Sequence, residues 1–184
     1  ATGQSIDNYL EFPILIITDP LGNIILRRAF NELGEGSGNS IINISDNEYI
    51  IAGNLNKGNG EISGFLMKTN NNGDIIWNIS TGNENSLENL LSVQKSGNSY
   101  IATGLSAVNT FDIYLIKTDL SGNVEWEKTF YSGGFGAGFS VQKSIGNGFV
   151  LTGYDYEGLN NKVRLTFLNV NESGDLIWRK NFLE

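Results

Sequence analysis

The chain has 184 residues, of which 40% are hydrophobic and 17% charged, enough apolar material for one domain with a buried core. Twelve Lys and Arg against 20 Asp and Glu give a net charge of -8, which argues against nucleic acid as a partner because phosphate binding needs concentrated positive charge. The absence of Cys and His excludes Ser-His-Asp and Cys-His catalysis, disulfides and nearly every zinc, copper or iron site.

A short segment at the N-terminus repeats a segment from the middle of the chain. Residues 1–5, ATGQS, match ATGLS at residues 102–106, where a repeat unit ends. We therefore expect residues 1–5 to be the end of a preceding unit. The longest aliphatic run, at residues 14–17, is strand-sized and predicts no transmembrane segment.

A turn-like stretch then recurs at a nearly constant spacing. The stretches are TDPLGN, TNNNGD, TDLSGN and VNESGD, and their glycines lie 51, 49 and 52 residues apart. Four residues after these glycines come one Leu and all three Trp of the chain. A second series of glycines, in YIIAG, YIATG and FVLTG, has spacings of 51 and 49. The two series predict a repeat of about 50 residues; its landmarks are Gly22, Gly73, Gly122, Gly174, Leu26, Trp77, Trp126, Trp178, Gly53, Gly104 and Gly153.

Each unit has the pattern of four short strands separated by turns. In the third copy, the strands are expected at residues 112–118, 124–130, 138–143 and 148–154. The Asp-x-x-Gly-Asn stretches predict turns in which the glycine takes a positive φ. Residues 86–94, SLENLLSVQ, have helical spacing, but their alignment with the other copies predicts a strand.

Four antiparallel strands per unit of this length are the anatomy of a β-propeller blade. The predicted fold is therefore all-β and a single β-propeller or propeller fragment, and the rival architecture is a flat or solenoidal β-array. One Trp per unit, at the same height, is expected to wedge each blade against its neighbour. The predicted division of the chain is 1–5 as the end of a preceding blade, complete units at about 13–62, 63–111 and 112–162, and a partial unit at 163–184.

Partial units at both ends leave three alternatives for closure. The chain is a fragment of a longer propeller, it closes as a small and irregular four-bladed ring, or it completes its open sheet with another copy.

The pattern YLIKTDLSGNVEWEKTF followed by SVQKSIGNGFVLTG resembles the β-propeller repeat of exported bacterial and archaeal surface proteins and lipoproteins. It is more distantly similar to quinoprotein-like repeats, which also place a Gly four residues before a docking Trp. The resemblance implies a secreted or cell-surface protein and no particular activity. Leu26 in place of Trp and Asn70 in place of the turn Asp indicate that these positions are structural.

Three turn aspartates, Asp19, Asp119 and Asp175, are weak candidates for calcium binding. One carboxylate per turn is too few for a site, and the spacing is not that of an EF-hand loop. A structural turn is the favoured interpretation, and neither a metal nor a cofactor is predicted.

The longer connections between strands are expected on one face of the propeller, where ligands would bind. Exposed aromatic side chains beside carboxylates in these loops are candidates for stacking on a sugar or anchoring a protein, and the alternative is that they pack loops onto the blade. The candidate binding residues are Tyr131, Phe135, Tyr154, Asp155, Tyr156 and Glu157. The long connections are residues 31–38, 54–60, 80–88, 105–110, 131–136 and 154–161.

Carboxylates could also support glycan hydrolysis if two of them approach one another near a central channel. The candidates are Glu32, Glu35, Asp112 and Glu157, while Lys57 and Arg164 are expected to be solvated charges.

The leading prediction is a non-enzymatic, exported module that binds a carbohydrate or a protein, or that spaces other domains. The first alternative is an assembly subunit that associates with another copy through open sheet edges. The second alternative is a carboxylate-dependent enzyme acting on glycans.

Overall fold

The computed structural model describes residues 1–7, 10–58, 60–82, 86–157 and 162–182. Within these residues the protein is built from β-strands and one short 3-10 helix, η1 (Asn31–Leu33), which confirms the all-β prediction. The strands are β1 (Thr2–Asp7), β2 (Leu10–Thr18), β3 (Ile24–Ala29), β4 (Gly36–Ser45), β5 (Glu48–Gly58), β6 (Glu61–Asn70), β7 (Ile75–Ser80), β8 (Leu87–Ser96), β9 (Ser99–Ala107), β10 (Phe111–Asp119), β11 (Val124–Phe130), β12 (Ala137–Lys143), β13 (Phe149–Glu157), β14 (Lys162–Val170) and β15 (Leu176–Phe182).

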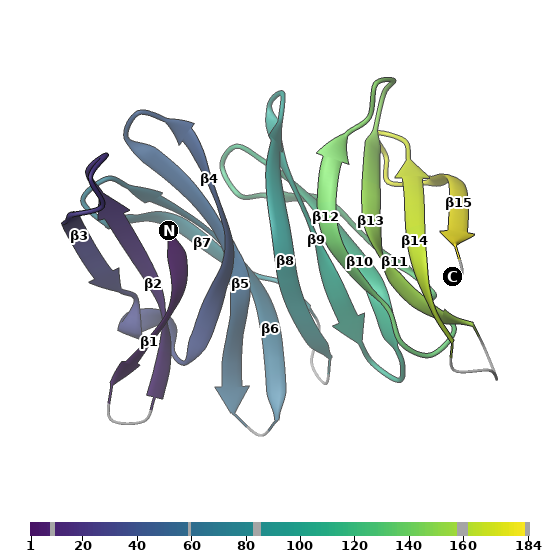
Figure 1. Cartoon of the computed structure of the whole chain (residues 1–184), viewed down its shortest axis with the longest axis horizontal. Coiled ribbons are helices and arrows are strands. Elements are labelled where there is room, and N and C mark those ends of the chain that lie inside the picture. Colours follow the sequence, from purple (N-terminus) through teal and green to yellow (C-terminus); the bar gives the residue numbers. More distant parts are fainter. Residues whose placement is uncertain (8–9, 59, 83–85, 158–161, 183–184) are drawn as a thin grey trace.

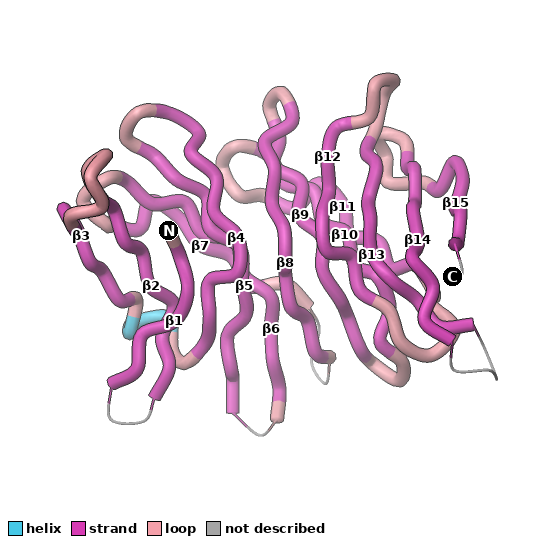
Figure 2. Tube along the Cα trace, in the orientation of Figure 1, coloured by secondary structure: helices cyan, strands magenta, loops and turns pink. Residues whose placement is uncertain are grey.

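Consecutive strands pair antiparallel and form four groups, which we call the first sheet (β1–β3), second sheet (β4–β7), third sheet (β8–β11) and fourth sheet (β12–β15). The second and third sheets are joined by a single parallel bridge between Ile62 and Leu87. Figure 2 shows that most of the described chain is strand. Residues 87–96 form β8, so the segment with helical spacing is a strand as predicted.

The four sheets stand in a row in chain order, with the first and fourth sheets at opposite ends (Figure 1). The first strand of each later sheet packs across the sheet before it: β4 against β1 and β2, β8 against β4, β5 and β6, and β12 against β8, β9 and β10. Among the described residues the row does not close into a ring.

The sheets are out of phase with the repeat units read from the sequence. The unit 112–162 spans the last two strands of the third sheet and the first two strands of the fourth, because β11 has no hydrogen bonds to β12. The predicted partial unit likewise coincides with β14 and β15, which complete the fourth sheet. Thr2 pairs with Leu15, so the N-terminal segment belongs to the same sheet as the strand that follows it.

The recurring turns owe their shape to one carboxylate and one amide. In the first turn, Asp19 Oδ1 accepts hydrogen bonds from the N–H groups of Leu21 and Asn23, and Asn23 Nδ2 donates to Asp19 Oδ2 at 2.7 Å. In the second turn the two side chains have exchanged places, and Asn70 bonds Asp74 in the same way. The turn glycines all have positive φ, between 78° and 87°; they are Gly22, Gly73, Gly122 and Gly174.

Two of the three indoles lie between sheets. Trp77 in β7 packs on Gly122 of the third sheet, and its Nε1 donates to the Leu120 carbonyl at 3.2 Å. Trp126 in β11 makes the same contact with Gly174 of the fourth sheet. Its Nε1 donates to the Glu172 carbonyl at 3.0 Å. Trp178, in the last strand, is 39% exposed.

Apolar side chains fill each space between neighbouring sheets and give three separate core clusters. The first–second cluster includes Leu15, Ile51, Phe65 and Met67; the second–third cluster includes Ile50, Leu66, Tyr100 and Ile116; the third–fourth cluster includes Ile101, Ile113, Phe149 and Leu168. The described residues contain no helix of the length and apolar character that a membrane crossing requires.

Candidate functional site

The long connections lie on one face of the row. Because the strands alternate in direction, the strand ends that lead into the connections between sheets, and those that lead from β5 to β6, β9 to β10 and β13 to β14, lie on the same side, at the bottom of Figure 1. The opposite side carries the tight turns. On the long-loop face, a pocket opens where the second sheet meets the third, and we call this place the second–third junction.

The centre of the pocket is a buried carboxyl group. Glu88, near the start of β8, is 3% exposed. Its Oε2 accepts a hydrogen bond from Ser86 Oγ and its Oε1 one from Ser106 Oγ, both at 3.0 Å. Burial raises the pKa of the Glu88 carboxyl above its ordinary value of 4.5, and the charge of Glu127 adds to this effect. The two serine hydrogen bonds and Lys57 oppose the rise. The Glu88 carboxyl is therefore held toward its protonated form.

A second carboxylate and a phenol lie beside Glu88. Glu127, in β11, and Tyr114, in β10, line the same pocket. The Tyr114 hydroxyl is buried next to Thr81 and Glu127 without a hydrogen bond of normal geometry, and burial raises the pKa of this phenol strongly. Tyr114 therefore stays neutral and has an unused hydroxyl at the pocket wall.

The pocket has two lobes that share Gly82, Ser86 and Glu88. One lobe has a volume of about 290 Å³ and contains Glu127 and Tyr114. The other has a volume of about 250 Å³ and reaches the second sheet, where the buried hydroxyl of Ser63 has no hydrogen-bond partner. The remaining lining side chains include Lys57, Glu61, Ser106 and Thr129. The lining thus combines carboxylates with unsatisfied hydroxyls.

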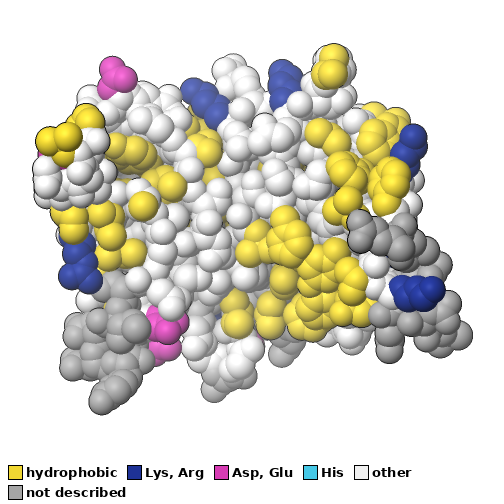
Figure 3. Space-filling view, in the orientation of Figure 1, with side chains coloured by type: hydrophobic (Ala, Val, Ile, Leu, Met, Phe, Trp, Pro, Cys, Tyr) yellow, Lys and Arg dark blue, Asp and Glu magenta, His cyan; other side chains and the backbone are white. Residues whose placement is uncertain are grey.

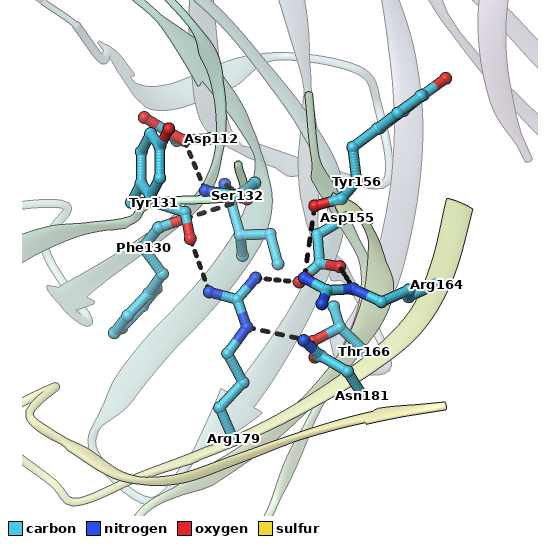
Figure 4. A network of polar contacts seen from close by, with 11 residues as sticks. Asp112, Phe130, Tyr131, Ser132, Asp155, Tyr156, Arg164, Thr166, Arg179 and Asn181 are labelled. Carbon is cyan, nitrogen blue, oxygen red and sulfur yellow. Dashed lines mark hydrogen bonds and ion pairs between the residues drawn. The ribbon is translucent and has the colours of Figure 1, made fainter. Parts of the chain in front are cut away.

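The third–fourth junction, where the third sheet meets the fourth, also buries a carboxylate, but this one is paired with two cations (Figure 4). Asp155 in β13 has no exposed surface. Its Oδ1 accepts from Arg164 Nε at 2.8 Å, and its Oδ2 accepts from Arg179 Nη2. Arg179 also donates from Nη1 to the Tyr131 carbonyl at 2.6 Å, which joins the fourth sheet to the connection that precedes it. Arg164, expected to be a solvated charge, is thus part of a buried ion pair.

Three of the predicted binding residues come together in an aromatic cluster. Phe135, Tyr154 and Tyr156 contact one another, with Phe135 stacked on Tyr154 at a ring-centroid distance of 5.7 Å. Phe111 and Phe139 complete the cluster. Figure 3 shows a broad hydrophobic area over the lower part of the third–fourth junction.

The other predicted binding residues lie apart from this cluster. Asp155 points to the opposite face of β13, into the ion-pair network, because successive side chains of a strand alternate between its faces. Tyr131 is exposed, and its backbone carbonyl serves Arg179. Glu157 ends β13, and its side chain falls outside the described structure.

The carboxylates proposed from the sequence do not meet at one place. Glu32 pairs with Arg28, and Glu35 lines a separate pocket between the first and second sheets. Asp112 accepts hydrogen bonds from Ser132 N and Thr110 Oγ1. The pair that does share a pocket, Glu88 with Glu127, was missed.

The turn aspartates are occupied by their own turns. The amide of Asn23 is the main cause that lowers the pKa of Asp19, and Asn123 does the same for Asp119. Asn171 lowers the pKa of Asp175, with Lys128 contributing. Each carboxylate already accepts N–H donors, as a structural turn requires.

Comparisons with known proteins bear on the fold. No protein-family model and no curated protein sequence matches the chain. Among solved structures, the chain is similar to β-1,2-mannobiose phosphorylase from Listeria innocua in complex with β-1,2-mannobiose, with a TM-score of 0.50 and 13% identity. The match covers 95% of this chain and 54% of that protein, so the chain spans about half the length of the phosphorylase.

This comparison corrects the leading prediction of a non-enzymatic binding or scaffolding module. This solved structure is that of an enzyme named for a disaccharide. The glycan-active alternative is therefore better supported than the module.

Proposed function

We propose that the chain forms part of a carbohydrate-active enzyme and that the pocket at the second–third junction binds a glycan and supports cleavage of a glycosidic bond. The observation that carries the proposal is Glu88, a buried carboxyl with a raised pKa that shares its pocket with a second carboxylate, Glu127. Pairs of carboxyl groups in different environments are the usual machinery for this chemistry. The similarity to a mannobiose phosphorylase supports a disaccharide or related glycan as substrate.

Glu88 is assigned as the proton donor. In the reaction, its protonated oxygen transfers the proton to the glycosidic oxygen while the bond from that oxygen to the anomeric carbon breaks. The incoming water or phosphate oxygen bonds to the anomeric carbon, and Glu88 is left as a carboxylate. The hydrogen bonds from Ser86 and Ser106 stabilise this charge as it forms.

Glu127 is assigned the opposite role because it is exposed and lies outside the buried wall that holds Glu88. An ionised carboxylate at this position stabilises positive charge on the sugar ring or takes the proton of an attacking water. Its negative charge also helps Glu88 to keep its proton.

The unsatisfied hydroxyls explain why a sugar suits the pocket. Ser63 and Tyr114 each bury a hydroxyl without a hydrogen-bond partner, one in each lobe. Buried polar atoms without partners cost about 1–3 kcal/mol each, and a ligand rich in hydroxyls supplies both donors and acceptors. The aromatic cluster on the same face offers a stacking surface for further sugar units.

We also propose that the four sheets are blades of a β-propeller of the exported surface-protein type. The approximately 50-residue repeat and the packing of each first strand across the preceding sheet support this architecture. The long-loop face would then be the ligand-binding face of the propeller.

The test is turnover of β-1,2-mannobiose, with and without inorganic phosphate, by the wild type and by Glu88→Gln. Removal of a general acid is expected to lower kcat by about 10²–10⁴-fold, while the dissociation constant for the disaccharide changes little. Glu35→Gln, in the pocket between the first and second sheets, is the matched control and should keep wild-type turnover. Unchanged kcat in Glu88→Gln, or no binding and no turnover by the wild type, would refute the proposal.

A further inference from the structure

The two lobes of the pocket at the second–third junction meet at Glu88, and each is completed by a different sheet. Gly82, Ser86 and Glu88 line both lobes. The third sheet supplies the rest of one lobe, which includes Glu127 and which we call the Glu127 lobe. The second sheet supplies the rest of the other lobe, which includes Ser63 and which we call the Ser63 lobe. A bond that Glu88 protonates therefore has space for a ligand group on each side.

The charges of the two lobes act on Glu88 with opposite signs. Burial is the largest cause of the raised pKa of Glu88; beyond it, the charge of Glu127 raises this pKa and the charge of Lys57 lowers it. Lys57 lies in the Ser63 lobe. The cation of the Glu127 lobe, Lys128, pairs with Asp175 at 3.2 Å. Glu88 therefore experiences negative charge from the Glu127 lobe and positive charge from the Ser63 lobe.

Cleavage of a glycosidic bond separates charge in one direction. Positive charge develops on the ring that carries the anomeric carbon, which we call the reacting ring, and negative charge develops on the leaving oxygen until it receives its proton. A carboxylate stabilises the positive charge, and a nearby cation stabilises the negative charge. The reacting ring is therefore favoured in the Glu127 lobe and the leaving group in the Ser63 lobe.

Each lobe also offers one buried hydroxyl for its part of the ligand. Ser63 and Tyr114 are each 3% exposed, and neither hydroxyl has a hydrogen-bond partner of normal geometry among the described residues. Tyr114 lines the Glu127 lobe, and Ser63 lines the other lobe. The two hydroxyls would therefore contact different halves of a bound disaccharide.

We propose that the pocket binds its substrate in a single orientation, with the reacting ring in the Glu127 lobe against Tyr114 and the leaving sugar in the Ser63 lobe against Ser63. This inference rests on the proposed function, because it takes Glu88 as the group that protonates the bond between the two sugars. Tyr114 is then a specificity-determining residue for the reacting ring, and Ser63 is one for the leaving group.

Two substrates with the same reacting ring test the assignment. β-1,2-Mannobiose has a sugar as its leaving group, whereas 4-nitrophenyl β-mannoside releases 4-nitrophenolate, which needs no proton and has no sugar hydroxyls. Ser63→Ala should lower kcat/KM for the disaccharide by about 3–10-fold and leave the value for the aryl mannoside unchanged. Tyr114→Phe should lower both values by a similar factor. Glu88→Gln should be impaired far more on the disaccharide than on the aryl mannoside.

Two matched variants and a melting curve control for effects on folding. Tyr100→Phe, in the same core cluster but at the other end of β9 from Ser106, and Ser121→Ala, in the exposed turn between β10 and β11, should keep both activities. Ser63→Ala and Tyr114→Phe each remove a hydroxyl that has no partner, so they should melt no lower than the wild type. A lower melting temperature of Ser63→Ala would show that its hydroxyl serves the fold, and would overturn its assignment to the substrate.

The outcomes separate this inference from the proposed function. A wild type that turns over neither substrate refutes both. If the wild type turns over both substrates and Ser63→Ala is impaired on both or on neither, the orientation is wrong while the enzyme assignment stands. The reversed pattern, in which Tyr114→Phe affects the disaccharide alone, also overturns the orientation, as does a wild type that accepts only one of the two substrates.

Discussion

The second–third and third–fourth junctions each bury a carboxyl group in the same region of the fold, but the two carboxyl groups have partners of different charge. At the second–third junction, Glu88 is held by two serine hydroxyls and faces another carboxylate. At the third–fourth junction, Asp155 is held by Arg164 and Arg179. A carboxylate between two arginines is neutralised and serves packing, whereas a carboxyl whose pKa is raised by burial and by a neighbouring like charge is a candidate for proton transfer.

Differences at equivalent positions of the third and fourth sheets produce this contrast. The strand registers align Ser106 with Asp155 and Glu127 with Arg179. Where the fourth sheet carries an acid and a base that satisfy one another, the third sheet carries a hydroxyl and an acid. The same scaffold therefore contains a closed ion pair at one junction and an open acidic pocket at the next.

The largest expected effect is a loss of stability when the ion-pair network at the third–fourth junction is broken. Asp155→Asn keeps the shape of the side chain but leaves Arg164 and Arg179 partly buried without a counter-charge. Breaking a buried pair in this way is expected to lower the free energy of unfolding by about 3–5 kcal/mol, measured by urea denaturation.

The control for Asp155→Asn is Lys128→Ala, which breaks the exposed Lys128–Asp175 pair. Surface pairs contribute about 0–1 kcal/mol, so this variant should melt close to the wild type. Equal stability of Asp155→Asn and the wild type would show that the network is not structural.

An intermediate effect on stability and turnover is expected when the second–third junction receives an arginine at the position equivalent to Arg179. Glu127→Arg places a guanidinium where a carboxylate now raises the pKa of Glu88, and should lower that pKa. We expect the free energy of unfolding to rise by about 1–2 kcal/mol because a buried carboxylate gains a charged hydrogen-bond partner. Turnover should fall because the lowered pKa disfavours the protonated form of Glu88 that donates the proton.

Glu125→Arg is the matched control for Glu127→Arg, since Glu125 lies two residues earlier on β11 and pairs with Lys117 outside the pocket. Its substitution should leave turnover intact. A Glu127→Arg protein that is less stable than the wild type would contradict the assignment of Glu88 as an uncompensated buried acid.

The architecture was more accessible from the sequence than the site. The turn glycines and their Trp partners revealed the period because the same steric need recurs at each contact between sheets. The sequence did not show which four consecutive strands form one sheet. A repeat that starts at β10 and one that starts at β12 have the same period of about 50 residues, and only the hydrogen bonds between strands distinguish the two groupings.

The pocket could not be predicted from the repeat because its central residue occupies a position that does not recur. Glu88 stands where the second and fourth sheets have Gly36 and Gly136, so it breaks the pattern. Arg164 and Asp155 break it too, and they find one another across the pair β13–β14. In this chain, departures from the internal repeat mark both the ion-pair network and the acidic pocket.

The smallest expected effect is a difference in how stability depends on pH between a carboxyl with a raised pKa, Glu88, and one with a lowered pKa, Asp119. The pKa of Glu88 is raised above 4.5, so the folded state holds this proton more tightly than the unfolded chain, and stability falls as pH rises through the folded pKa. Glu88→Gln cannot ionise, so its free energy of unfolding should gain on the wild type as pH rises above 4.5, by about 1 kcal/mol for each unit of pKa shift.

The pKa of Asp119 is lowered below 3.8, which gives the opposite sign: its contribution is present above that pH and is lost as pH falls through the folded pKa. Asp119→Asn should therefore differ most from the wild type at neutral pH and converge with it in acid, as measured by urea unfolding at a series of pH values. If the Glu88→Gln difference also shrinks toward neutral pH, Glu88 is an ordinary stabilising carboxylate, and the contrast between the two junctions disappears with its proposed catalytic role.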